Sequence, residues 1–177
     1  DPVHGRELWV SDGTAQGTRI VLEVHPGTDG IQVRDQLAVG DRVYLLTHDA
    51  LLGGELWVSD GTGGGTSIVK RAEPGLRKSS PYVLGALGHR VILAAEDAEH
   101  GLEPWISDGT PGGTSLLVDI VPGPTGSSPG RGVAAGGRLY FPAADAAHGT
   151  EPWSSDGTAQ GTALIADLRP GPDSSWP

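Results

Sequence analysis

The sequence predicts an all-β protein, a β-propeller-like array of four-stranded antiparallel blades, and three observations lead to this fold class. One motif returns at a spacing of 48 residues, as Trp9, Trp57, Trp105 and Trp153 show. Short apolar runs are separated by turns that contain glycine, which is typical of β-hairpins. No segment of the sequence has a sustained apolar period of 3.6 residues with helix caps.

The repeated unit reads Asp-x-x-His-Gly-x-Glu-x-Trp-x-Ser-Asp-Gly-Thr-x-x-Gly-Thr and is followed by Pro-Gly. Only Leu52 breaks the set of leading histidines, and the period contains no insertion. The single repeat domain 1–177 therefore divides into units 1–48, 49–96, 97–144 and 145–177, the last of them truncated. A period of this length suits helical repeats or propeller blades, and the strand pattern favours blades. A β-solenoid is the remaining alternative, although its usual units are shorter.

Each unit is predicted to hold two pairs of strands. Residues 7–11 and 19–24 flank an Asp-Gly turn, a strong hairpin signal. A second pair, residues 36–39 and 42–47, is joined by Gly40-Asp41. Later units repeat the second pair at residues 82–87, 90–95, 132–135 and 138–143. Four short strands are the expected content of one blade.

The first strand of each unit is expected to be covered on both faces. Trp9 points to one side of this strand, while Leu8 and Val10 point to the other. A lone sheet cannot bury its two faces, so neighbouring blades must cover them, with each Trp packing against the next sheet. The residues assigned to this structural role are Trp9, Trp57, Trp105, Trp153, Glu7, Glu55, Glu103 and Glu151.

The glutamates and two prolines of the same strand predict its surroundings. Each Glu lies beside a packed Trp, where an unpaired charge is costly. We expect these carboxylates to accept hydrogen bonds that tie the loop before the strand to the hairpin.

Pro104 and Pro152 replace Leu8 and Leu56. Because proline cannot donate to a ladder, we expect this strand to lie at a sheet edge or to start at the proline, and we interpret it as the innermost strand of its blade.

The last unit predicts an open array. It stops at Pro177, in register with Pro81 and Pro129, before its second strand pair, so fourteen strands of sixteen are expected. The sequence contains no Met and begins inside a motif, which indicates a piece of a longer chain. We therefore expect an incomplete arc of a larger propeller, or an arc that closes with another chain.

Composition and charge exclude several classes of protein. The formal net charge is -10, which argues against a phosphate-backbone partner, so no nucleic acid is expected. No apolar run approaches the roughly 18 residues of a membrane helix, so this segment should not insert into a membrane. There is no cysteine, hence no thiolate zinc site and no cysteine nucleophile.

The carboxylates of the Asp-Gly turns are the candidate metal ligands: Asp12, Asp60, Asp108 and Asp156. A hairpin Asp also accepts backbone N–H bonds within its own turn. The sequence contains no Asp-x-Asp-x-Asp-Gly calcium loop. We therefore assign a structural turn, with calcium as the alternative, and expect no other cofactor.

The Asp-x-x-His pairs and the motif serines are the candidates for catalysis. Histidine titrates near neutrality and can serve acid-base or metal chemistry. An enzyme needs one asymmetric constellation, whereas these pairs recur in equivalent places, so linker structure is preferred and no residue is assigned as catalytic. The serines lack a Gly-x-Ser-x-Gly elbow. The pairs are Asp1 with His4, Asp97 with His100, and Asp145 with His148; the serines are Ser11, Ser59, Ser107 and Ser155.

Function is expected where the repeats differ, because the shared residues already build the blade. The loops after Pro-Gly vary most, and they carry the candidate partner contacts Arg77, Lys78, Arg131 and Trp176. Trp176 replaces a serine of earlier units and is a candidate for glycan or protein contact. Local packing of this Trp is the alternative.

The motif strand and turn resemble a known family. Residues 7–14 read Glu-Leu-Trp-Val-Ser-Asp-Gly-Thr, and residues 55–62 repeat the same letters. This resembles the bacterial repeat family named after its ELWxxDGT motif, and the likeness extends over all four units. Departures are Pro104 and Pro152 for Leu, Leu52 for His, and the missing last hairpin. The resemblance implies large bacterial proteins that are secreted, periplasmic or attached to the cell surface and propeller-like; it implies no activity.

The sequence therefore predicts a binding and scaffolding module outside the cell, without enzyme activity, that presents variable loops to a protein partner. One alternative is a lectin-like, glycan-binding propeller that depends on calcium and gains avidity from repeated weak sites. A hydrolase or lyase is less favoured, because it needs a cluster that does not repeat. Other copies of the chain, or the rest of a longer chain, are expected as further partners.

Overall fold

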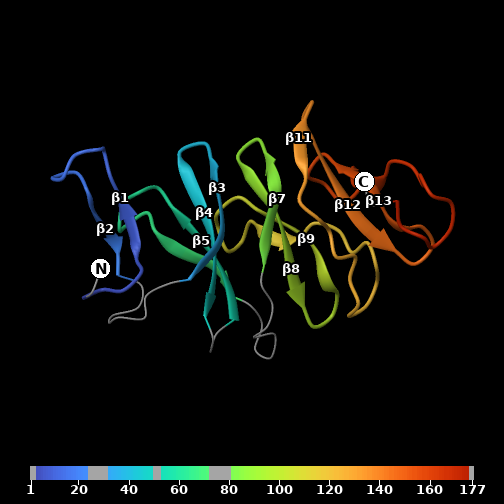
Figure 1. Ribbon diagram of the computed structural model, residues 1–177, viewed down its shortest axis with the longest axis horizontal. Helices are drawn as coiled ribbons and strands as arrows, with labels where there is room; N and C mark the ends of the chain where they lie inside the picture. The colour runs from blue at the N-terminus through green and yellow to red at the C-terminus, as the bar shows by residue number, and fades with distance from the viewer. Residues whose placement is uncertain (1–2, 24–31, 50–52, 72–80, 176–177) are drawn as a thin grey trace.

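The computed structural model describes residues 3–23, 32–49, 53–71 and 81–175, and these residues are all-β (Figure 1). They contain fourteen strands and no helix. In the described part of the chain, no helix is therefore long and apolar enough to cross a membrane. The strands form one two-stranded and three four-stranded antiparallel sheets, which confirms the predicted fold class.

The sheets follow one another along the chain, and each is a simple meander. The first sheet pairs β1 (Leu8–Val10) with β2 (Arg19–Leu22). The second holds β3 (Val33–Val39), β4 (Arg42–Asp49), β5 (Gly53–Ser59) and β6 (Ser67–Arg71). The third holds β7 (Tyr82–Leu87), β8 (Arg90–Asp97), β9 (Gly101–Ser107) and β10 (Thr114–Leu116). The fourth holds β11 (Val133–Ala135), β12 (Arg138–Asp145), β13 (Gly149–Ser155) and β14 (Ala163–Leu164).

Each four-stranded sheet begins in one 48-residue unit and ends in the next, which corrects the expectation that one unit supplies one blade. In the second sheet, β3 and β4 come from the first unit, and Leu45 of β4 pairs with Trp57 of the second unit. The short Asp-x-x-His loop joins β8 directly to its antiparallel neighbour β9, whereas residues 117–132 carry the chain from β10 to a new sheet. Short connections keep consecutive strands adjacent, so the longer loop separates the sheets.

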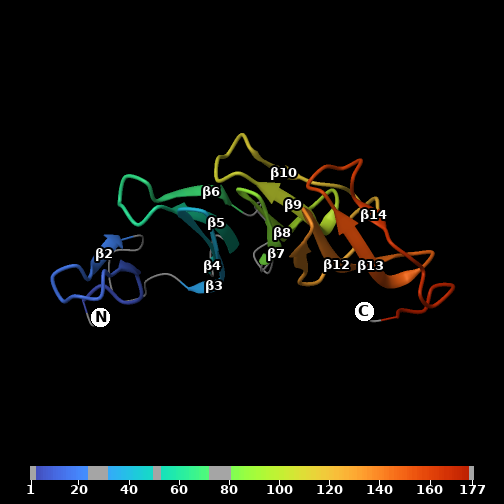
Figure 2. The same ribbon diagram turned by 90° about the horizontal axis from the view of Figure 1, so that it is seen from above.

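The sheets stand side by side and form an open, blade-like array. Seen from above, they follow a curve, with β6 and β10 on its outer side and β3 and β7 on its inner side (Figure 2). The first sheet and the fourth sheet lie at opposite ends of this curve (Figures 1 and 2).

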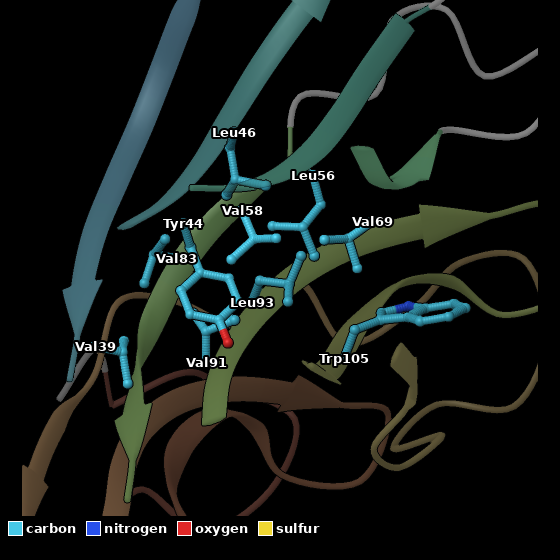
Figure 3. Close-up of a cluster of buried hydrophobic side chains, with 10 residues drawn as sticks. All are labelled: Val39, Tyr44, Leu46, Leu56, Val58, Val69, Val83, Val91, Leu93 and Trp105. Atoms are coloured by element: carbon cyan, nitrogen blue, oxygen red, sulfur yellow. The ribbon is translucent and has the colours of Figure 1, made fainter. Parts of the chain in front are cut away.

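The core lies between neighbouring sheets. One cluster joins the second and third sheets (Figure 3) and consists of Val39, Tyr44, Leu46, Leu56, Val58, Val69, Val83, Val91, Leu93 and Trp105. Another joins the third and fourth sheets and consists of Leu84, Leu87, Ile92, Ala94, Ile106, Leu117, Leu139, Phe141 and Ala143. The third sheet is thus covered on both faces, as the alternation of its strands predicts.

The strands that carry Pro104 and Pro152 are interior strands, so their predicted place at a sheet edge is wrong. β9 lies between β8 and β10, and β13 lies between β12 and β14. The carbonyl oxygen of Pro104 accepts the N–H of Leu117 (2.9 Å), and Pro152 accepts that of Ile165 (2.9 Å). In a strand the nitrogen of a residue faces the same neighbour as its carbonyl. The N–H that each proline lacks would point toward β10 or β14, at a position where that strand has already ended. Its absence therefore removes no hydrogen bond between the paired strands.

Candidate functional site

The Asp-Gly hairpin folds into the same closed hydrogen-bond network in all four units. In the third unit, Asp108 Oδ1 accepts the backbone N–H (2.9 Å) and the hydroxyl (2.7 Å) of Thr110. Ser107 Oγ accepts the N–H of Gly109 (3.1 Å) and lies 2.6 Å from Thr114 Oγ1. The Thr114 hydroxyl donates to the carbonyl of Thr110 (2.7 Å). The polar residues of the motif thus bond to one another across the turn.

Two glycines of this hairpin are required by its geometry. Gly109 has φ +87°, in the left-handed region that favours glycine. At Gly113 a Cβ would lie 2.1 Å from Asp108 Oδ1, so a side chain there would collide with the carboxylate. The same close approach recurs at Gly17, Gly65 and Gly161.

The turn carboxylates are exposed and bonded within their own loops. Hydrogen bonds from the side chain and then the backbone of the following Thr lower the pKa of each of them: Asp12, Asp60, Asp108 and Asp156. In the ranges that the structure describes, no group of three or more His, Cys, Asp or Glu side chains is arranged to hold a metal. A calcium role for the turns remains a prediction.

The Asp-x-x-His loops are closed by their own carboxylates. Asp97 Oδ1 accepts the N–H groups of Glu99 (3.0 Å) and His100 (2.6 Å), and Asp97 Oδ2 lies 2.9 Å from His100 Nδ1. Asp145 and His148 repeat this arrangement, with 2.8 Å between Oδ2 and Nδ1. Asp1 lies outside the described residues.

The two described pairs have shifted pKa values. The hydrogen bond to Asp97 raises the pKa of His100, against a smaller opposing effect of desolvation. Burial raises the pKa of Asp97, but hydrogen bonds from the His100 side chain and from the backbone outweigh it, so this pKa is lowered overall. The pKa values of His148 and Asp145 shift in the same directions for the same reasons. Each pair therefore closes a short loop, and protonation of the histidine strengthens its contact with the carboxylate.

Two of the motif glutamates, Glu103 and Glu151, fasten the loop that follows the hairpin, whereas the loop before the strand was expected. Glu103 is fully buried; its Oε1 accepts the N–H of Val121 (2.9 Å), and its Oε2 accepts the hydroxyl of Ser127. Glu151 is also buried and accepts the N–H groups of Leu168 (3.0 Å) and Ser175 (3.0 Å). One buried carboxylate thus anchors the connection from the third to the fourth sheet, and another anchors the segment that follows the fourth sheet.

The surroundings of these glutamates shift their pKa values in opposite directions. Burial raises the pKa of Glu103, and the charge of Asp119 adds to this against the hydrogen bonds that Glu103 accepts. Burial also raises the pKa of Glu151, but the bonds from Ser175 and from the Leu168 backbone outweigh it and lower this pKa. In the second unit, Glu55 accepts the indole N–H of Trp57 (3.0 Å).

Trp105 and Trp153 pack against the sheet before their own, whereas packing against the next sheet was predicted. Trp105 joins the cluster with the second sheet, and Lys70 Nζ of β6 lies 4.4 Å from the centroid of its ring. Trp153 packs against the cluster shared with the third sheet. A cavity of about 30 Å³ beside Trp105 has room for about one water molecule. Lys70 therefore covers one face of the Trp105 ring.

Arg131, a predicted partner contact, bonds to the inner strands while its side chain stays 66% exposed. Its guanidinium lies 2.8 Å from Asp35 Oδ2 on β3, and the same oxygen accepts the N–H of Val83 on β7 (2.8 Å). Asp35, Val83 and Arg131 are 48 residues apart, so they occupy the same position in three consecutive units. An alignment of the units could therefore have indicated that these residues meet. The other predicted contacts, Arg77, Lys78 and Trp176, lie outside the described residues.

Sequence reasoning missed an arginine that recurs at the start of β4, β8 and β12. Arg90 Nη1 donates to the carbonyl of Gly157 in the next sheet (3.3 Å). The charge of Arg42 helps to lower the pKa of Asp108 in the next sheet, after the bonds from Thr110. Arg42, Arg90 and Arg138 recur every 48 residues, and this spacing could have identified them as part of the repeat.

No protein-family model matches the chain, and no curated protein shows significant similarity to it.

Proposed function

We propose that the chain is a non-enzymatic binding and scaffolding module that presents the loops between its sheets to a protein partner. The observation that carries this proposal is the anchoring of residues 117–131. Glu103 holds this loop through Val121 and Ser127, and a parallel bridge joins Leu102 to Gly126. A loop that is already ordered loses little conformational entropy when it binds.

The exposed tip of the loop is the surface offered to the partner. Pro124 and Thr125 are exposed, whereas Gly126 and Ser127 beside them are buried. Among the anchoring residues, Glu103 recurs in every unit and Ser127 recurs as Ser79 and Ser175, while the residues of the tip vary between units. Such a division between rigid support and variable tip is typical of loops that bind on a fixed scaffold.

A role without catalysis is supported by the repetition of the polar groups. The Asp97–His100 and Asp145–His148 pairs occupy equivalent places, and each carboxylate is bonded to its own loop. An active site needs one asymmetric arrangement of such groups.

The resemblance of the motif to bacterial surface repeats supports a location outside the cell, secreted, periplasmic or at the surface.

The test uses a loop variant with a matched control. In P124R/T125R the tip changes while Glu103 and its partners remain; Ser115→Arg alters an exposed position on β10 of the same sheet. Both proteins and the unmodified chain are cross-linked to extracted bacterial surface proteins, and the captured species are identified by mass spectrometry.

A protein captured by the unmodified chain and by Ser115→Arg, but lost with P124R/T125R, supports the proposal. Equal capture by all three contradicts a role for the loop. The same proteins on a glycan array, with and without calcium, test the alternative: calcium-dependent glycan binding would replace the protein partner by a glycan.

A further inference from the structure

Each hairpin of the repeated motif carries an Asp-Gly pair whose aspartate is exposed, and such a pair is chemically labile. The backbone nitrogen of the glycine can attack the side-chain carboxyl carbon of the aspartate, because glycine has no side chain to hinder the approach. An N–C bond forms, and the amide proton leaves with a carboxyl oxygen as water, which closes a succinimide ring. Water then opens the ring at either carbonyl, so the product is Asp or isoaspartate. Isoaspartate adds a carbon atom to the backbone and would disrupt the turn.

The carboxylate that would be attacked is held in place by the threonine of the motif. Asp108 Oδ1 accepts the N–H (2.9 Å) and the hydroxyl (2.7 Å) of Thr110. The Thr110 hydroxyl in turn accepts the N–H of Gly113 (3.0 Å), which fixes its own position. These bonds restrict rotation of the carboxylate toward the glycine nitrogen. They also lower the pKa of Asp108, and an ionised carboxylate loses an oxygen as water less readily than the neutral acid does.

The attacking nitrogen is restrained by the serine of the motif and by the preceding sheet. The N–H of Gly109 donates to Oγ of the fully buried Ser107 (3.1 Å). Gly109 is itself buried, and a Cβ at this glycine would lie 3.0 Å from Tyr44 Oη and 3.1 Å from Arg42 Nη1. The nitrogen therefore has a bonded proton and little room for the movement that the attack requires.

The same restraints recur at every motif pair. The N–H of the glycine donates to the preceding Ser at 3.0, 3.0, 3.1 and 2.9 Å in the four units. The hydroxyl of the following Thr donates to the Asp at 2.7 Å in all of them. In the fourth unit, Arg90 Nη2 lies 2.9 Å from where a Cβ of Gly157 would stand, so the preceding sheet covers this glycine as well.

We propose that the Ser and Thr of the Ser-Asp-Gly-Thr motif protect its Asp-Gly pair from succinimide formation and isomerisation. The Ser holds the nucleophile, and the Thr holds the carboxyl group that would be attacked. This role is independent of the proposed binding function. The sequence contains a natural comparison, because Asp29-Gly30 stands between Thr28 and Ile31 and has neither the Ser nor the Thr. That pair lies outside the described residues.

The experiment incubates the folded chain at neutral pH in water labelled with heavy oxygen. Each succinimide that hydrolyses takes up one labelled oxygen, so digestion and mass spectrometry count the events at every Asp-Gly pair separately. Ser107→Ala removes the acceptor of the glycine N–H, and Thr110→Val removes the hydroxyl. Thr110→Ser keeps the hydroxyl and is the matched control. The chain unfolded in guanidinium chloride gives the unprotected rate.

We expect the four motif pairs to react much more slowly in the folded chain than in the unfolded chain, and more slowly than Asp29-Gly30. Ser107→Ala and Thr110→Val should each accelerate the reaction at Asp108 by about fivefold, the factor that corresponds to one lost hydrogen bond of typical net strength. Thr110→Ser should leave the rate unchanged. The other three motif pairs of each variant should keep their rates, which shows that the effect is local.

Equal rates at Asp108 in the folded and the unfolded chain would overturn the proposal. Unchanged rates at Asp108 in Ser107→Ala and Thr110→Val would overturn it too, because the rigid fold alone would then protect the pair. A variant that accelerates all four motif pairs together has lost its fold. In that case Thr158→Val, with Thr158→Ser as its control, decides the question in the fourth unit, where the same bonds are present.

Discussion

At the scale of single residues, the hairpin shows why its motif contains the residues that it does. Asp108, Thr110 and Thr114 bond to one another over a few residues, and Gly113 has no room for a side chain beside the Asp108 carboxylate. Each constraint is local and needs no other unit. The same letters therefore produce the same turn four times.

Gly113→Ala tests this constraint. A Cβ 2.1 Å from the Asp108 carboxylate forces the turn apart, and we expect it to lower the free energy of unfolding by about 2 kcal/mol, a typical cost of overpacking. Urea unfolding measures the change. The matched control is Gly112→Ala, where a Cβ meets no described atom within 4 Å and should cost far less. Equal costs at both positions would contradict the role of the close approach.

His100 supplies a prediction about pH. The folded state raises its pKa above the reference value of 6.5, so the ion pair with Asp97 stabilises the fold fully below that value. This stabilisation is lost as the pH rises through the raised pKa. We therefore expect the difference in unfolding free energy between the unmodified chain and His100→Gln to shrink as the pH rises above 6.5. An NMR titration giving a His100 pKa at or below 6.5 would contradict the ion pair.

At the scale of elements, buried carboxylates decide how the long loops lie. Glu103 joins residues 121 and 127 to β9, and Glu151 does the same for residues 168 and 175 on β13. The sequence placed these glutamates beside the tryptophans and predicted that they accept hydrogen bonds. It assigned the bonds to the wrong loop, because the partner lies 18 to 24 residues further along the chain.

Glu103→Ala should release the loop from the third sheet. Two hydrogen bonds to a buried carboxylate are lost, and we expect a cost of about 3 kcal/mol in unfolding free energy. Amide hydrogen exchange should accelerate at Val121 and Ser128 more than in the strands β8 and β9. Glu99→Ala, an exposed glutamate in the neighbouring loop, is the control. Unchanged exchange at Val121 would show that other contacts hold the loop.

At the scale of the whole molecule, stability comes from sheets that cover one another. The two apolar clusters lie between sheets, so each sheet depends on its neighbours. In such an array stability is approximately a sum of units and of the interfaces between nearest neighbours. The inner strands add the contact of Asp35 with Arg131, which joins the second sheet to the loop before the fourth.

Trp57→Ala and Trp9→Ala compare an interior interface with an end face. Trp57 is buried, and its truncation should lower the unfolding free energy by about 3–5 kcal/mol, as for large core residues. Trp9 is half-exposed, so the same change should cost much less. Urea unfolding of both variants measures the difference. A small effect at Trp57 would place this side chain outside the core.

The sequence by itself determined the period, the strand pairs and the chemistry of the turns, because these depend on contacts within a hairpin. Only the tertiary structure decided which pairs share a sheet, that Pro104 lies in an interior strand, and which neighbour covers each Trp. A perfect period leaves these choices open, since every unit offers the same surfaces. Contacts such as that of Asp35 with Arg131, 96 residues apart, form only once the sheets are in place.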